Sequence, residues 1–307
     1  SRMHELNFIS DEEYEKVKNE IVIFVPQQIG GIKAPHFVFF IKDYLEQKYG
    51  SELVERGGLK VTTTLDYGLE EKAEQYIKEG ALENEKAWDG NNASLVAIDP
   101  KTGQILVMVG SRDYFDKKID GNYNVATAHR QPGSSFKPFI YATAFNKGFT
   151  PETVLFDLPT EFQTTCNAKG RALPGHNQKE CYMPDNYDNK FRGPMSLRDA
   201  LGQSINLVAV KLFYLAGLPD SLKTAEDMGI STLKDINQYG LTLVIGGGEV
   251  TLLDMSSAYG VFANDGIRNP YTGILKVEDI KGKILEEYAP NTKEVLPKKT
   301  ALTISDI

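Results

Sequence analysis

Two serines and a lysine stand close together in RQPGSSFKPFIYATAF, residues 130–145. Pro138 lacks an amide hydrogen and its ring is tolerated only near the start of a helix, so we expect a helix to begin within a residue or two of Ser134. Lys137 then lies on the same face as Ser134. A serine that loses its proton to an unprotonated amine can attack a carbonyl carbon, and the free amides of the helix start can stabilise the oxyanion.

The same residues also fit an ordinary helix start, in which a serine caps the helix and the lysine is on the surface. Ser231 and Lys234 have the same spacing, so Ser-x-x-Lys alone identifies no site. Ser204-Ile205-Asn206 is the only Ser-x-Asn in the chain. A hydroxyl and a carboxamide two residues apart cannot share a helix face, but both can face a cleft from a short connection between helices. There the hydroxyl can pass a proton between an amine and a leaving group, and the amide can hold a substrate carbonyl.

The elements around these residues mix strands and helices without a regular alternation. Alternating β-branched residues predict strands at 59–66, 93–100 and 104–111, the last two joined by a tight turn. Apolar periodicity predicts a helix after Asp66, with Leu69, Ala73, Tyr76 and Ile77 on one face. The sequence therefore predicts an α+β fold with an antiparallel sheet.

Further helices are predicted from their caps and their apolar spacing. They cover 9–19, with a capping box of Ser10 and Glu13, then 37–50, ended by Gly50, then 196–217, and finally 251–266, capped by Thr251 with Asp254. A Gly- and Pro-containing linker is expected at 26–35, and residues 150–193 are predicted to be mostly loop.

Composition excludes some classes of function. The 307 residues carry a net charge of −8, which argues against a nucleic-acid partner. No apolar run approaches the roughly 20 residues that span a bilayer, so we expect a soluble chain whose membrane anchor would lie upstream. Cys166 and Cys181 lack metal-ligand spacing, and we expect neither a metal nor a cofactor. By spacing alone the two cysteines are either free thiols or one disulfide.

Four segments, in this order, resemble the transpeptidase domain of class A penicillin-binding proteins. They are DPKTGQILVMVG, RQPGSSFKPFIYA, NYDNKFRGPMSLRDALGQSINLVAVKL and GGGEVTLLDMSSAYGVFANDG. The resemblance implies that residues 1–58 are the tail of a glycosyltransferase domain and a linker, and that residues 59–307 belong to the transpeptidase domain. It also implies the family's fold, a mainly antiparallel sheet with helices on both faces and a cleft at its edge.

The resemblance assigns roles to the candidate residues. Ser134 matches the acylated serine, Lys137 its base, and Ser204 with Asn206 the second motif of the cleft. The implied reaction is D,D-transpeptidation: the serine attacks the D-Ala-D-Ala bond of a peptidoglycan stem peptide and passes the acyl group to an amine of a neighbouring strand. β-Lactam antibiotics trap the same serine.

The resemblance further implies an extracytoplasmic location, in the periplasm or at the outer face of the membrane, with cell-wall assembly proteins as further partners. Because disulfides persist outside the cytoplasm, it favours a Cys166–Cys181 disulfide.

One part of the family pattern is missing. No Lys-Thr-Gly or Lys-Ser-Gly occurs between residues 207 and 307, and Lys101-Thr102-Gly103 precedes the nucleophile and has the composition of a turn. Since residues 297–307 resemble the helix before that third motif, we expect a chain that stops short of the motif and of the closing strands. Two other functions stay open: a serine β-lactamase-like hydrolase, although no Glu-x-x-Leu-Asn follows Asn206, and a catalytically incomplete cell-wall scaffold.

Overall fold

The computed structural model describes residues 2–18 and 31–307, which divide into two units. The first unit, up to Lys33, contains α1 (Arg2–Glu5) and α2 (Asp11–Lys18). The predicted capping box is confirmed: Ser10 N donates to Glu13 Oε2 (2.9 Å), and Glu13 N donates to Ser10 Oγ (3.2 Å). Residues 26–30, half of the linker predicted at 26–35, lie outside the described residues.

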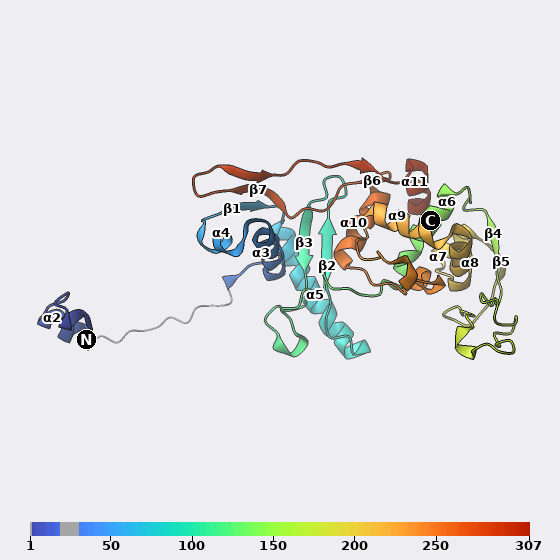
Figure 1. Ribbon diagram of the computed structural model, residues 1–307, viewed down its shortest axis with the longest axis horizontal. Helices are drawn as coiled ribbons and strands as arrows, with labels where there is room; N and C mark the ends of the chain where they lie inside the picture. Colours follow the sequence, from blue (N-terminus) through green and yellow to red (C-terminus); the bar gives the residue numbers. More distant parts are fainter. Residues whose placement is uncertain (1, 19–30) are drawn as a thin grey trace. The chain divides into compact units, whose positions relative to one another are not determined.

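The second unit, Ala34–Ile307, holds the remaining elements (Figure 1). Its helices are α3 (Pro35–Tyr49), α4 (Ser51–Arg56), α5 (Tyr67–Trp88), α6 (Lys137–Asn146), α7 (Leu197–Gly202), α8 (Asn206–Ala216), α9 (Leu218–Met228), α10 (Leu252–Ala263) and α11 (Lys298–Asp306). Its strands are β1 (Lys60–Thr63), β2 (Leu95–Ile98), β3 (Ile105–Val109), β4 (Val154–Asp157), β5 (Gly193–Ser196), β6 (Ile267–Arg268), β7 (Ile274–Glu278), β8 (Ile284–Glu287) and β9 (Lys293–Glu294).

All the named strand pairs are antiparallel, which confirms the predicted α+β class. Strands β1, β7 and β8 form the largest sheet of the described residues, in the order β1-β7-β8. The other pairs are β2 with β3, β4 with β5, and β6 with β9. None of the helices described is long and apolar enough to cross a membrane.

The hairpin of β2 and β3 confirms that Lys101-Thr102-Gly103 is a turn. Asp99 accepts from the Lys101 backbone N–H at Oδ1 (2.9 Å) and from the Thr102 hydroxyl at Oδ2 (2.8 Å). Gly103 has a φ of +75°, and a Cβ there would lie 2.3 Å from the carbonyl oxygen of Pro270. Only glycine fits this position, so the tripeptide has a structural role in the turn.

Helix α5 packs on β3, where Ala73, Val107 and Val109 form a small core (Figure 1). The buried stripe of the helix differs from the predicted face: Leu69 and Tyr76 are exposed. The stripe runs instead through Glu70, Ala73, Ile77 and Ala81, because a long helix on a two-stranded hairpin buries only a narrow strip. Glu70 is buried and its Oε2 accepts from Met108 N (2.8 Å), and burial raises the pKa of this carboxyl to about 7.

The main core lies among the helices from α6 to α11. Helix α8 is apolar on nearly all sides, so it is buried along most of its length and packs against α6. In α6, Phe139, Ile140 and Tyr141 are fully buried. Helix α10 is capped as predicted, since Asp254 N donates to Thr251 Oγ1 (2.9 Å). These packed helices hold the two candidate motifs in fixed positions.

Candidate active site

The candidate nucleophile lies on a short 3₁₀ turn, η3 (Gly133–Phe136), directly before α6. Helical backbone therefore begins near Ser134 as predicted, but the α-helix itself begins only at Lys137. Pro138 explains the difference. It has no N–H to donate to the Ser134 carbonyl, and the N–H of Lys137 donates to that carbonyl instead. Side chains three apart in a 3₁₀ turn lie nearly one above the other, which keeps Ser134 and Lys137 on the same side.

Lys137 is 1% exposed, whereas Ser134 is exposed. The Nζ of Lys137 forms hydrogen bonds with the Ser204 carbonyl oxygen (2.6 Å), Asn206 Oδ1 (2.8 Å) and Ser204 Oγ (3.1 Å). An ammonium donates to all three of these oxygens. A neutral amine donates to the carbonyl and to the amide oxygen, and its lone pair can accept from the Ser204 hydroxyl. The site therefore provides partners for both protonation states.

The burial of Lys137 makes its neutral amine far more populated than that of an exposed lysine. Burial lowers the pKa of Lys137 to about 8, because the charged form loses its hydration. None of its hydrogen-bond partners among the described residues is a carboxylate that would hold the charge. A lysine with this pKa can take a proton from a hydroxyl near neutral pH.

Ser204 and Asn206 occupy the break between α7 and α8. The pattern predicted as one helix over 196–217 is thus two helices. Ser204 causes the break, since its φ of +55° is left-handed and cannot continue either helix. This conformation directs the Ser204 carbonyl and hydroxyl to Lys137, and Asn206 begins α8 with its side-chain oxygen on the same Nζ.

A cleft of about 660 Å³ opens over these groups. Ser134, Lys137 and Ser204 line it, together with residues of α10 and α11 such as Tyr259 and Ile304. Three of the four predicted residues thus share one hollow. Asn206 contacts Lys137 at the edge of the cleft, and both ends of its amide are engaged by protein groups, since its Nδ2 donates to the Asp185 carbonyl (3.2 Å).

Asn186 is a functional residue that the sequence analysis missed. Its Oδ1 accepts from the backbone N–H groups of Asn206 and Leu207 (both 3.1 Å), so it caps α8 from a distant segment. Its Nδ2 donates to Asp157 Oδ1 (2.8 Å), and Asp157 is fully buried. Asn186 lies in a segment that carries the family resemblance, but a contact with residues about twenty positions further along the chain, beyond β5 and α7, leaves no periodic signal.

Tyr259 was also missed. Its hydroxyl donates to the carbonyl of Ser135 (2.7 Å), and its ring packs edge-on against Phe139 and Phe262. The phenol therefore links α10 to the turn that carries Ser134. An aromatic residue in a helix is ordinarily part of a core, so no sequence pattern distinguishes this one.

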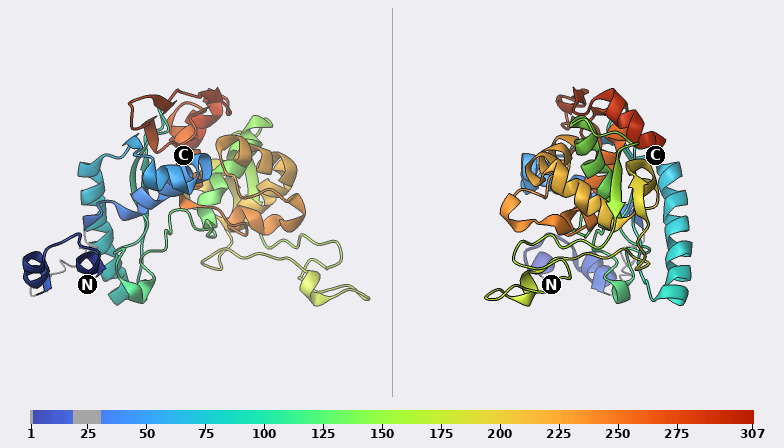
Figure 2. Two further views of the ribbon diagram at one scale, coloured as in Figure 1. Left: turned by 60° about the vertical axis from the view of Figure 1, so that its left-hand side comes forward. Right: turned by 90° about the vertical axis from the view of Figure 1, so that its right-hand side faces the viewer.

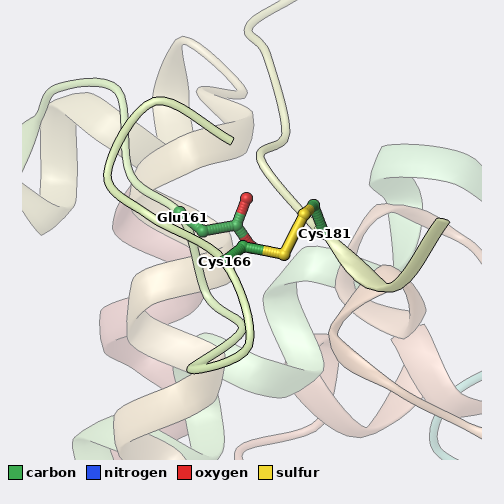
Figure 3. A group of neighbouring side chains, drawn as sticks. All are labelled: Glu161, Cys166 and Cys181. Carbon is green, nitrogen blue, oxygen red and sulfur yellow. A yellow bond between two sulfur atoms is a disulfide. The ribbon is translucent and has the colours of Figure 1, made fainter. Parts of the chain in front are cut away.

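The loop between β4 and β5 projects from the helices in both views of Figure 2. Cys166 and Cys181 form a disulfide in it, with Cα atoms 5.6 Å apart, as the family resemblance favours. Glu161 lies beside this bond (Figure 3), and its Oε1 accepts from Gln163 N (2.9 Å) and Tyr182 N (2.7 Å). Because both sulfur atoms are bonded to each other, they offer no thiolate to a metal.

The second Ser-x-x-Lys has a different environment. The Ser231 hydroxyl donates to Asp254 Oδ2 (2.6 Å), and Lys234 is exposed. This pair therefore lacks the buried amine that distinguishes Ser134 and Lys137.

Comparisons with known proteins identify the family of this chain. The family model described as the penicillin binding protein transpeptidase domain matches residues 93–307. Penicillin-binding protein 2D of Bacillus subtilis is 33% identical over 310 residues, which cover 99% of this chain and 42% of that protein. Penicillin-binding protein 1A of Aquifex aeolicus is 29% identical, covering 97% and 49%. The chain thus spans less than half the length of these relatives.

Solved structures share the fold. Penicillin-binding protein 1A from Haemophilus influenzae superposes with a TM-score of 0.77 at 21% identity, covering 99% of this chain and 61% of the other. A Mycobacterium tuberculosis protein solved in complex with penicillin V gives a TM-score of 0.66 at 22% identity, covering 88% and 69%.

Proposed function

Since this chain belongs to the penicillin-binding protein transpeptidase family, we propose that it carries the acyl-serine centre of a peptidoglycan D,D-transpeptidase. The buried amine of Lys137 is the observation that supports this most strongly. It has a pKa near 8, it lines the same cleft as Ser134, and Ser204 and Asn206 hold it in place. A surface lysine beside a helix cap would have none of these features.

In the proposed reaction, Ser134 Oγ attacks the carbonyl carbon of the penultimate D-alanine, and its proton passes to the neutral amine of Lys137. The bond to the terminal D-alanine breaks as its nitrogen receives a proton through the Ser204 hydroxyl, which lies 3.1 Å from Lys137 Nζ. An amine of a neighbouring strand then attacks the acyl ester, which forms the cross-link and frees Ser134. A β-lactam follows the first step and stays attached to the serine.

The rest of the assignment follows from the same proposal. Residues 1–58 are the end of a glycosyltransferase domain and a linker, and residues 59–307 are transpeptidase. The substrates are stem peptides ending in D-Ala-D-Ala, and the reaction takes place outside the cytoplasm, where a membrane anchor upstream of this chain would hold the protein. Cell-wall assembly proteins are further partners under this assignment.

Mass spectrometry after incubation with a penicillin tests the proposal. We expect one adduct, located on Ser134 by peptide mapping, and none in Ser134→Ala. Ser135→Ala is the matched control, because that serine lies next in the chain and its hydroxyl donates to the Pro132 carbonyl (2.6 Å); it should keep the adduct.

The same experiment separates the other functions. An adduct on another residue would refute the site. Rapid turnover of the penicillin would support a β-lactamase-like hydrolase, since a transpeptidase retains the acyl group. A wild-type chain that forms no adduct would support a catalytically incomplete scaffold.

A further inference from the structure

A second hollow, of about 1010 Å³, opens between α3, the segment before β2 and the loop after β3. Aromatic rings, side-chain amides and one guanidinium line it. We call it the aromatic–amide hollow, and its defining residues are Phe39, Tyr114, Tyr123, Asn91, Asn122 and Arg130. None of these residues lines the cleft that contains Ser134.

Each of the three defining aromatic rings of this hollow contacts another ring or a cation. Phe39 and Tyr114 stack with centroids 5.7 Å apart and planes at 10°, and Tyr114 also meets His36 edge-on at 5.0 Å. Tyr123 is 52% exposed, and the Arg130 guanidinium lies 5.8 Å from the centre of its ring. Aromatic surface exposed in a hollow favours a ligand with flat apolar faces, such as the C–H faces of pyranose rings.

The polar groups of the hollow favour a neutral ligand. Asn91 and Asn122 are exposed, and neither side chain has a hydrogen-bond partner among the described residues, so each amide can both donate and accept. Asp43 and Asp120 offset the single cation, Arg130, which argues against a phosphate or another anion. Hydroxyl and N-acetyl groups of an amino sugar are donors and acceptors of the kind that these amides can pair with.

A third hollow lies next to both the aromatic–amide hollow and the active-site cleft. This hollow, of about 430 Å³, shares Val125 and Arg130 with the aromatic–amide hollow, and shares Ser135 and Tyr259 with the cleft. Arg130 precedes Ser134 by four residues, so their Cα atoms are at most about 14 Å apart. An extended peptide of about four residues spans the same distance.

We propose that the aromatic–amide hollow binds the glycan backbone of the peptidoglycan strand whose stem peptide is acylated at Ser134. This proposal rests on the proposed function, because it identifies where the sugar part of that same substrate lies. The glycan occupies the wide hollow, and its peptide runs past Arg130 and Ser135 to the nucleophile. The strand is thus recognised in the aromatic–amide hollow, whereas its peptide bond reacts in the cleft that contains Ser134.

Titration calorimetry with peptide-free peptidoglycan glycan strands as the probe tests this inference. We expect the wild-type chain to bind them and Tyr123→Ala to bind about tenfold more weakly, since one central aromatic contact is lost. Asn91→Ala, on the other wall, should also weaken binding severalfold, which covers the case that the tyrosine variant does not fold. Tyr187→Ala is the matched control: Tyr187 is fully exposed, lies outside the hollow and should leave binding unchanged.

Penicillin labelling of the same wild-type sample distinguishes the two proposals. A chain that forms the Ser134 adduct but binds no glycan would overturn the inference and leave the proposed function standing. A chain that binds glycan through Tyr123 but forms no adduct would support the hollow and count against the function. Glycan binding that is equal in wild type, Tyr123→Ala and Asn91→Ala would also overturn the inference.

Discussion

The acylation rate of Ser134 should depend on pH through Lys137. Only the neutral amine can take the serine proton, so the rate should rise with pH and level off above about pH 8, the pKa that burial gives this lysine. At pH 7.5 a group with that pKa is neutral in roughly a quarter of the molecules. An unperturbed lysine would be neutral in only about one molecule in a thousand.

Asn206→Asp perturbs this balance with little change in shape. It replaces the amide oxygen that lies 2.8 Å from Lys137 Nζ with a carboxylate. A negative charge this close raises the pKa of the ammonium by about 1–2 units. The acylation rate at pH 7.5 should then fall roughly ten- to a hundredfold, and most of it should return at high pH. The variant also loses the hydrogen bond that Asn206 Nδ2 donates to the Asp185 carbonyl (3.2 Å). This loss slows acylation by the same factor at every pH, so it does not move the midpoint of the pH–rate profile.

Quenched mass spectrometry of penicillin labelling between pH 6 and pH 11 measures both profiles. Asn291→Asp, which makes the same chemical change at an exposed site outside the cleft, should leave the midpoint at the wild-type value. A midpoint that stays in place or moves down in Asn206→Asp would refute the assignment of Lys137 as the base.

Three further predictions concern Asn186, Tyr259 and Glu70. Asn186→Ala removes two hydrogen bonds that cap α8 and one hydrogen bond to buried Asp157. It should lower the free energy of unfolding by about 3 kcal/mol, measured by urea titration, and slow the acylation of Ser134, measured by penicillin labelling. Unchanged values in both assays would contradict this prediction. Tyr259→Phe removes the donor to the Ser135 carbonyl and should cost about 1 kcal/mol and slow labelling without moving its pH midpoint, so a shifted midpoint would count against a positioning role. Glu70 has a folded pKa raised to about 7, so its own contribution to stability should fall by about 3 kcal/mol as pH rises from about 4.5 to above 7. Buried His36, with a pKa lowered to about 4, acts in the opposite direction, so the test is the difference between wild type and Glu70→Gln in urea titrations, which should change by that amount over this range; a constant difference would disprove the account.

The positions of the reactive groups were predictable where local geometry determines them. Pro138 limits where the helix can start and so placed Ser134 beside Lys137. The break at Ser204 was not predicted, because the apolar spacing continues from 196 to 217 and only the left-handed backbone of Ser204 interrupts it. The 3₁₀ form of the turn was not foreseen, because it depends on which carbonyl loses its donor to the proline ring.

Contacts between residues that are far apart in the chain could not be predicted from the sequence. Asn186 reaches α8 from an irregular loop, and the two-residue strands β6 and β9 are too short to show alternation. The predicted buried face of α5 was wrong in part. Apolar spacing indicates which face of a helix can be buried, but the width of the β2–β3 hairpin decides how much of that face is covered.

The disulfide between Cys166 and Cys181 also determines how the chain withstands a break. A protease cut between these residues leaves the two fragments joined through sulfur. Asn186, which holds the start of α8, lies outside the closed ring. Residues 167–180 can therefore be cleaved, lengthened or fused to a reporter while the groups that hold Lys137 stay in place, so this ring is a suitable attachment point for a fluorescent label.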